Sequence, residues 1–133
     1  MSDQNIFQID QILLSFATVD EVKIREVISY DPKKQLLKEL VDIFDVEMDD
    51  KINLIKQTYA SNQMSEVSKL AHRIRSTSLN LGATRLSEIL KRIEYMTLES
   101  EIIRTELDFL INSLEKEFTS ASTKLHSFLA ESL

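Results

Sequence analysis

The sequence of 133 residues contains no cysteine and no tryptophan, and it has only one glycine and one proline. Without cysteine, disulfide bonds and thiolate-bound metals are excluded, and a reducing compartment suits the chain. With one glycine and one proline, the chain has few of the residues that form tight turns and hairpins. The composition therefore predicts an all-α protein.

Features of membrane proteins, secreted proteins and nucleic-acid binders are also missing. No apolar run approaches the roughly 20 residues of a membrane span, and the N-terminus lacks a basic region followed by an apolar one. The net charge of −6 at pH 7 argues against nucleic-acid binding. We therefore expect a cytoplasmic protein with neither a nucleic-acid nor a membrane partner.

Motifs for nucleotide binding, hydrolysis and metal binding are absent as well. One glycine cannot supply a GxxxxGK[ST] or a GxGxxG loop, so we expect no ATP site. The only histidines are His72 and His126, and a shared metal site would need their helices to converge and further ligands. We expect no cofactor and no metal in this chain.

The first thirty residues are predicted to form two short helices. The first covers residues 6–16, and the second runs to about Ser29 from a capping box made by Thr18 and Glu21. The apolar positions that predict them are Ile9, Ile12, Leu13 and Phe16, and then Val22, Val27 and Ile28.

Four longer helices are predicted to follow. Asp31 and Pro32 predict a helix start. The Asp31 carboxylate can accept hydrogen bonds from the free N–H groups of the first turn, and proline has no N–H that needs a partner there. Gly82 marks a helix end, because glycine tolerates the left-handed conformation that closes a helix. The predicted segments run from Pro32 to about Ala60, from Gln63 to Gly82, from Ala83 to about Met96, and from about Glu101 to Phe128.

One side of the first long helix is acidic, which could mean either a divalent-cation site or an ordinary solvated face. Its carboxylates lie at mixed angles on one helix with no converging loop, so a divalent-cation site is disfavoured. An ordinary solvated face is the better interpretation. The residues are Glu39, Asp42, Asp45, Glu47, Asp49 and Asp50.

The last helix has a nearly heptad-spaced apolar stripe, which is typical of a bundle. Short connections make consecutive helices antiparallel neighbours. We therefore predict an antiparallel four-helix bundle, up-down-up-down, with one or two short N-terminal capping helices, as a single domain over residues 1–133.

The stretch over residues 68–94 carries the candidate chemistry. On a helix, His72 lies about 150° from the centre of the apolar stripe, so its imidazole should face solvent. Arg75 and Ser76 share this side of the helix, as does Ser68. Residues 64–96 carry a net charge of +3 while the rest carries −9, which suits an anionic partner site.

A solvent-facing neutral imidazole is a nucleophile near pH 7. Arg75 could pair with an anionic group attached to the His72 ring, and Ser68 and Ser76 could donate hydrogen bonds to it. Since the chain has no nucleotide site, the residues favour a phosphoryl acceptor that receives its phosphate from another protein. The alternative is an ordinary surface histidine without a function.

This stretch resembles the signature of histidine-containing phosphotransfer (HPt) domains, over about residues 19–128. The family pattern has Ala-His, an apolar residue, a basic residue, small residues, Leu-Gly-Ala, Leu and a final Leu-Glu. The matching residues are Ala71-His72, Ile74, Arg75, Thr77-Ser78, Leu81-Gly82-Ala83, Leu86 and Ile93-Glu94.

The resemblance implies that His72 accepts a phosphoryl group from the aspartyl phosphate of a receiver domain and passes it to another receiver. The resemblance implies receiver domains of response regulators, including that of a hybrid sensor kinase, as partners, and the receiver would supply Mg²⁺. Arg75 would stabilise the phosphate. We expect the chain to be a monomeric phosphocarrier, and the predicted receiver-facing residues are Ser68, Lys69, Arg73, Ser76 and Leu79.

Two residues depart from the family pattern, because Ser76 stands where glycine is usual and Leu79 where a small residue is usual. Both keep open a second interpretation, in which the bundle is an adaptor that binds receivers without accepting phosphate. A dimerisation fragment of a sensor kinase is disfavoured, because four amphipathic helices already suffice to close one bundle.

Overall fold

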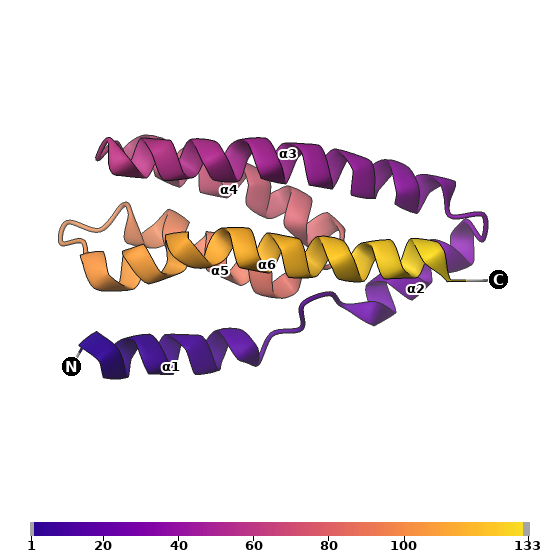
Figure 1. Cartoon of the computed structure of the whole chain (residues 1–133), viewed down its shortest axis with the longest axis horizontal. Coiled ribbons are helices and arrows are strands. Elements are labelled where there is room, and N and C mark those ends of the chain that lie inside the picture. Colours follow the sequence, from indigo (N-terminus) through magenta and orange to yellow (C-terminus); the bar gives the residue numbers. More distant parts are fainter. Residues whose placement is uncertain (1, 132–133) are drawn as a thin grey trace.

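The computed structural model of the protein describes residues 2–131, which form six α-helices (Figure 1). The predicted all-α class is confirmed. Among these helices, none combines the length and the apolar character that a bilayer crossing requires. The helices are α1 (Ser2–Leu14), α2 (Glu21–Tyr30), α3 (Gln35–Ala60), α4 (Met64–Asn80), α5 (Thr84–Met96) and α6 (Arg104–Ala130).

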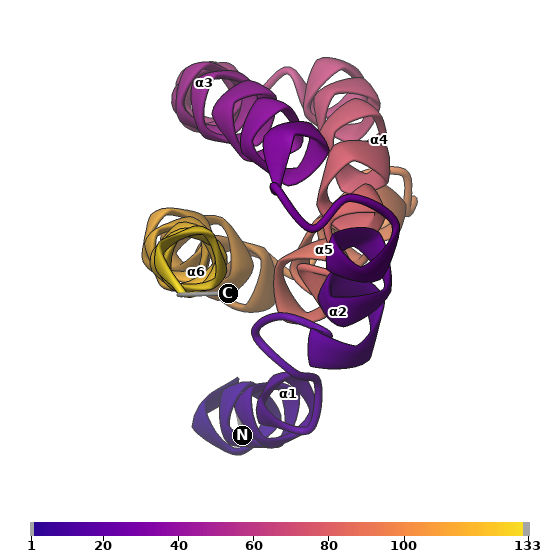
Figure 2. The same cartoon turned by 90° about the vertical axis from the view of Figure 1, so that its right-hand side faces the viewer.

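Helices α3 to α6 form the predicted four-helix bundle. Each of the four packs against two others: α4 contacts α3 and α5, and α6 also contacts α3 and α5 (Figure 2). The α4–α5 side of the bundle is therefore opposite the α3–α6 side. The apolar stripes predicted from sequence supply the core, with Phe44, Ile74, Leu90 and Leu125 among the fully buried side chains.

The two N-terminal helices occupy different places on the bundle. Helix α2 lies across one end, whereas α1 runs lengthwise beside α5 and α6 (Figures 1 and 2). Ile9 and Leu13 bury the inner face of α1, and Ile24 buries that of α2. Ile12 and Val22, two of the apolar positions from which these helices were predicted, do not take part in this packing and are exposed.

The predicted helix starts differ from the observed ones. Asp20, not Thr18, caps α2, because its carboxylate accepts from the backbone N–H of Lys23 at 3.3 Å. Helix α3 begins at Gln35 rather than at Pro32. Asp31 does accept a free donor, the N–H of Leu36 at 2.7 Å, but it does so from outside the helix.

The turn between α4 and α5 follows the prediction for Gly82. Its φ of +68° is the left-handed conformation that closes α4. A Cβ atom added there would approach the Cβ of Asp20 to 3.2 Å and its backbone N and O to 3.4 Å. The backbone N–H of Asp20 donates to the Gly82 carbonyl at 2.7 Å, so the glycine lets the chain before α2 pack directly on this turn.

Cationic side chains hold the C-terminal end of α6. Lys34 is buried and has a left-handed φ of +61°. Its Nζ donates to the carbonyls of Phe128 at 2.6 Å and Glu131 at 2.8 Å. Arg25 forms two hydrogen bonds to the Glu131 carboxylate, at 2.6 and 3.0 Å. The last carbonyls of α6 thus receive the donors that a helix C-terminus lacks.

Candidate functional site: a histidine on the α4–α5 side

Helix α4 presents His72 to solvent. The imidazole is 63% exposed, while Val67, Ala71 and Ile74 on the opposite face are completely buried. The prediction that the ring faces outward is therefore confirmed, and its chemical role remains a prediction. The buried face fixes the rotation of α4, and that rotation determines where the ring lies.

Glu94 of α5 holds the imidazole of His72. Its Oε2 lies 3.0 Å from Nδ1 of the ring. An ionised carboxylate can only accept hydrogen bonds, so a neutral imidazole makes this contact as the tautomer with its proton on Nδ1 and its lone pair on Nε2. The ring is thereby fixed in the tautomer whose nucleophilic nitrogen is the one not bonded to Glu94.

Arg75 is more enclosed than the sequence predicted. We expected an accessible side chain, but it is only 21% exposed. Its Nη1 lies 3.2 Å from Oε1 of Glu94, and its guanidinium lies 5.9 Å from the ring centroid of Tyr95. One oxygen of the Glu94 carboxylate thus faces the imidazole of His72, and the other faces the guanidinium of Arg75. The Arg75 cation lies one helical turn from His72.

Ser68 is not a surface residue, and the prediction that it faces a partner is wrong. Its side chain is buried, and its hydroxyl donates to the carbonyl oxygen of Glu94 at 3.0 Å. The hydroxyl of Thr97 donates to the same carbonyl at 2.9 Å. Helix α5 packs over this part of α4, so Ser68 holds the backbone of Glu94 and cannot reach the open side of the ring.

The other predicted receiver-facing residues are all exposed. Lys69 and Arg73 flank the histidine, and Ser76 and Leu79 lie further along α4. Leu79 is 44% exposed, which is a large apolar surface for a side chain at the end of a helix. The structure therefore brings His72 together with one cation-rich and partly apolar surface.

Two hollows open along the α4–α5 side, one on each side of the Arg75–Glu94 contact. The first has a volume of about 350 Å³ and is lined by Ser65, Ser68, Lys69, His72, Glu94 and Leu98. The second has a volume of about 370 Å³ and is lined by Phe16, Arg75, Leu79, Thr84, Ser87, Glu88, Lys91 and Tyr95.

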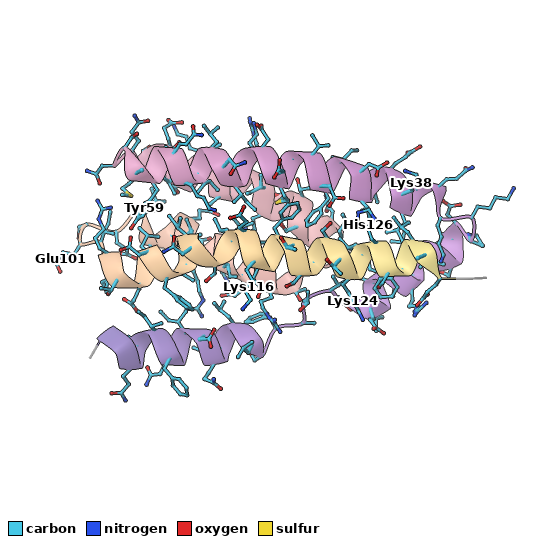
Figure 3. The ribbon with its side chains drawn as sticks, viewed as in Figure 1. Lys38, Tyr59, Glu101, Lys116, Lys124 and His126 are labelled. Carbon is cyan, nitrogen blue, oxygen red and sulfur yellow. The ribbon has the colours of Figure 1, made fainter. Side chains whose placement is uncertain are left out.

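The second histidine lies on the opposite side of the bundle. His126 of α6 contacts Asp45 of α3, with Nε2 at 2.7 Å from Oδ2, and Ser122 donates to the other oxygen of that carboxylate at 2.7 Å (Figure 3). The two histidines therefore do not converge on one metal. Among the described residues, no three His, Asp or Glu side chains are grouped as metal ligands.

Glu94 is the residue of the candidate site to which the sequence assigned no role of its own. A signal for it was present, because Ile93-Glu94 ends the signature stretch. Its pairing with His72 depends on the register of α5 against α4, which the packing of two helices determines and a helical wheel does not show.

Comparison with known proteins identifies one family. The family model of the Hpt domain matches residues 39–122, which is more than half of the chain. The matched residues include all of α4 and α5 and hence His72, Arg75 and Glu94. No curated protein and no solved structure is significantly similar to the chain.

Proposed function

Because the chain belongs to the Hpt-domain family, we propose that it is a phosphocarrier of a two-component phosphorelay and that Nε2 of His72 accepts the phosphoryl group. Family membership indicates a phosphotransfer role. The position of His72 carries the assignment to this residue, because it lies within the family-matched residues 39–122 and His126 lies outside them. The hydrogen bond between Nδ1 of His72 and Glu94 supports Nε2 as the acceptor atom, because it leaves the outer ring nitrogen with the lone pair that attacks.

The transfer needs few groups from this chain. The Nε2 lone pair attacks the phosphorus of an aspartyl phosphate on a receiver domain, and the bond from phosphorus to the aspartyl oxygen breaks with its electron pair on that oxygen. The ring then holds the phosphoryl group at Nε2 and a proton at Nδ1, and the Glu94 carboxylate faces the resulting positive charge. Attack by the aspartate of a second receiver reverses these steps.

Arg75 supports the phosphoryl group in this proposal. Its guanidinium stands beside Glu94, one turn from the ring, and a bidentate donor suits a phosphoryl group. Positioning and charge neutralisation supply most of the catalysis in phosphoryl transfer. We expect the Mg²⁺ that assists the reaction to be bound by the receiver, and Lys69 and Arg73 to lie at the interface with it.

A single chain is sufficient for this function. The apolar stripes of α3 to α6 are buried against one another within one bundle, and all residues of the proposed site come from α4 and α5. We therefore propose that residues 1–133 act as one domain and as a monomer.

The experiment that tests the proposal is the transfer of labelled phosphate from phosphorylated receiver domains of the same genome. We expect an acid-labile, alkali-stable adduct on the wild type and none on His72→Gln. His126→Gln is the matched control and should be labelled normally, because that ring lies on the opposite side and contacts Asp45. Label retained by His72→Gln would refute the assignment.

The adaptor interpretation is tested by the same experiment. It is favoured by Ser76 and Leu79, which depart from the family pattern and are both exposed on the His72 side. An adaptor would bind receivers in a pull-down and never acquire label. A carrier would do both.

A further inference from the structure

The chain between α1 and α2 lies outside the residues that match the family and is nevertheless bonded to the α4–α5 turn. The carbonyl of Ala17 accepts from the backbone N–H of Arg85 at 3.0 Å and from the hydroxyl of Thr84 at 2.6 Å. Lys23, at the start of α2, donates from Nζ to the carbonyl of Leu79 at 2.6 Å. We call residues 13–20, which comprise the last two residues of α1 and the chain that leads to α2, the strap.

The side chain of Arg85 fixes the first half of the strap. Its Nε donates to the carbonyls of Leu13 at 3.1 Å and Phe16 at 3.0 Å, and its Nη2 lies 3.4 Å from the carbonyl of Leu14. These are the free carbonyls at the C-terminal end of α1, where a cation is favourable. The strap is therefore held on the bundle by backbone contacts that do not depend on the identity of its own side chains.

This attachment places Phe16 on the functional side of the bundle. Its half-buried ring lines the 370 Å³ hollow together with Leu79 and Tyr95, and Arg75 forms part of the same wall. One wall of the hollow next to the candidate phosphoacceptor is thus made by a segment outside the family-matched residues.

We propose that this composite hollow receives an apolar side chain of the receiver domain, and that Phe16 makes the strap a determinant of which receivers are accepted. The inference rests on the proposed function. It assigns a role in partner selection to a residue of the N-terminal segment, whereas the acceptor chemistry stays with α4 and α5.

Two observations identify the occupant as part of the receiver. The hollow adjoins the acceptor site, because Arg75 lines the hollow and contacts Glu94, which in turn holds His72. The hollow is lined by two cations, Arg75 and the exposed Lys91, and by one carboxylate, Glu88, whose charge is paired with Arg92 at 3.0 Å. The chemistry thus fits an apolar side chain flanked by an acidic one, presented by a protein that docks over His72.

The experiment compares Phe16→Ala with Phe7→Ala, which removes an exposed aromatic ring of α1 outside the hollow. Each variant is labelled on histidine with phosphoramidate, a small donor that needs no docking surface, and is then discharged by receiver domains from the same genome. We expect normal labelling of both variants. We expect KM for discharge to rise about tenfold in Phe16→Ala and to be unchanged in Phe7→Ala.

A second substitution separates docking from folding. Phe16→Leu keeps most of the apolar surface, so it should melt like the wild type and show an intermediate KM. Wild-type KM values for every receiver in both Phe16 variants would overturn the inference. A wild-type protein that is labelled by phosphoramidate but discharged by no receiver would instead refute the proposed function on which the inference rests.

Discussion

One buried carboxylate, that of Glu94, contacts both His72 and Arg75, the two side chains of the proposed phosphoryl site. Oε2 is 3.0 Å from Nδ1 of His72, and Oε1 is 3.2 Å from Nη1 of Arg75. The Oε1 contact brings opposite charges together without the direction of a hydrogen bond. The carboxylate therefore favours one tautomer of the neutral imidazole and keeps the guanidinium near it.

Glu94→Gln tests this role with little change in size. A glutamine amide can accept from a protonated Nδ1 or donate to an unprotonated one, so it no longer enforces one tautomer. We expect transfer to His72 to slow roughly tenfold, equivalent to about 1.4 kcal/mol. Nitrogen NMR shifts of the ring should show a mixture of tautomers.

The control for this prediction is Glu88→Gln, which removes the carboxylate that pairs with Arg92 on the same helix at 3.0 Å. It should leave both the rate and the ring shifts of His72 unchanged. A single tautomer and a wild-type rate in Glu94→Gln would show that the carboxylate is only a packing element.

Leu79→Ala measures the contribution of an exposed apolar side chain near the histidine. Since Leu79 is 44% exposed, its truncation should lower the free energy of unfolding by less than about 1 kcal/mol. Receiver affinity should fall by about tenfold or more if the side chain anchors the partner. Titration calorimetry against receivers and thermal melts measure the two effects, and a large loss of stability with unchanged affinity would contradict the assignment.

At the scale of the helices, sequence periodicity was sufficient to predict the four-helix bundle but insufficient to predict where the helices begin. The apolar stripes of α3 to α6 are buried as predicted because each needs only its own helical spacing. The start of α2 was misplaced because Asp20, rather than Thr18, is held in position by the carbonyl of Gly82. That contact joins distant segments, and local capping patterns cannot reveal it.

The same distinction explains the site. The exposure of His72 and Leu79 follows from the rotation of α4 alone, and it was predicted. The burial of Ser68 and the partial enclosure of Arg75 depend on Glu94 and Tyr95 of α5. Side chains at the margin of a helix face are exposed or covered according to the neighbouring helix, and a wheel for one helix does not contain that information.

The α4–α5 turn offers a test at this scale. Gly82→Ala places a Cβ in the left-handed conformation and against Asp20, and we expect it to lower the free energy of unfolding by about 1–3 kcal/mol. Chemical denaturation monitored by circular dichroism measures the loss. Asn62→Gly, at another left-handed turn with φ of +60°, is the control; it relieves the left-handed strain but removes the exposed hydrogen bond that Arg104 donates to the Asn62 side chain, so the net change in stability should be small.

A loss at Gly82 no greater than the change at Asn62 would contradict the close contact with the strap. If the contact is real, part of the loss in Gly82→Ala should also appear as faster amide exchange at Asp20, whose N–H is bonded to the Gly82 carbonyl.

At the scale of the whole molecule, the N-terminal and C-terminal segments are joined at one end. Hydrogen bonding with the Arg25 guanidinium lowers the pKa of the Glu131 carboxyl from its ordinary value of 4.5. Because the folded-state pKa is the lower one, this pair stabilises the fold above about pH 4.5 and stops doing so as the pH falls through the folded-state pKa.

Glu131→Gln should therefore melt at a lower temperature than the wild type at pH 7, and the difference should vanish in strong acid. Scanning calorimetry between pH 7 and pH 2 measures it. Glu101→Gln, which changes an exposed glutamate near the other end of α6, should not alter the pH dependence. A difference that persists undiminished at pH 2 would show that the charge of Glu131 is not responsible.

The uneven distribution of charge makes the molecule an electric dipole. Residues 64–96, which include α4 and α5, carry a net charge of +3 and the rest of the chain carries −9, and carboxylates of α3 such as Asp45 and Asp49 gather on the α3–α6 side. An approaching molecule with an acidic face experiences a torque that turns its acidic face toward His72 before any atoms touch. The electric field thus orients the partner before contact, so fewer random reorientations are needed. Each collision then begins closer to the arrangement that the proposed phosphoryl transfer requires.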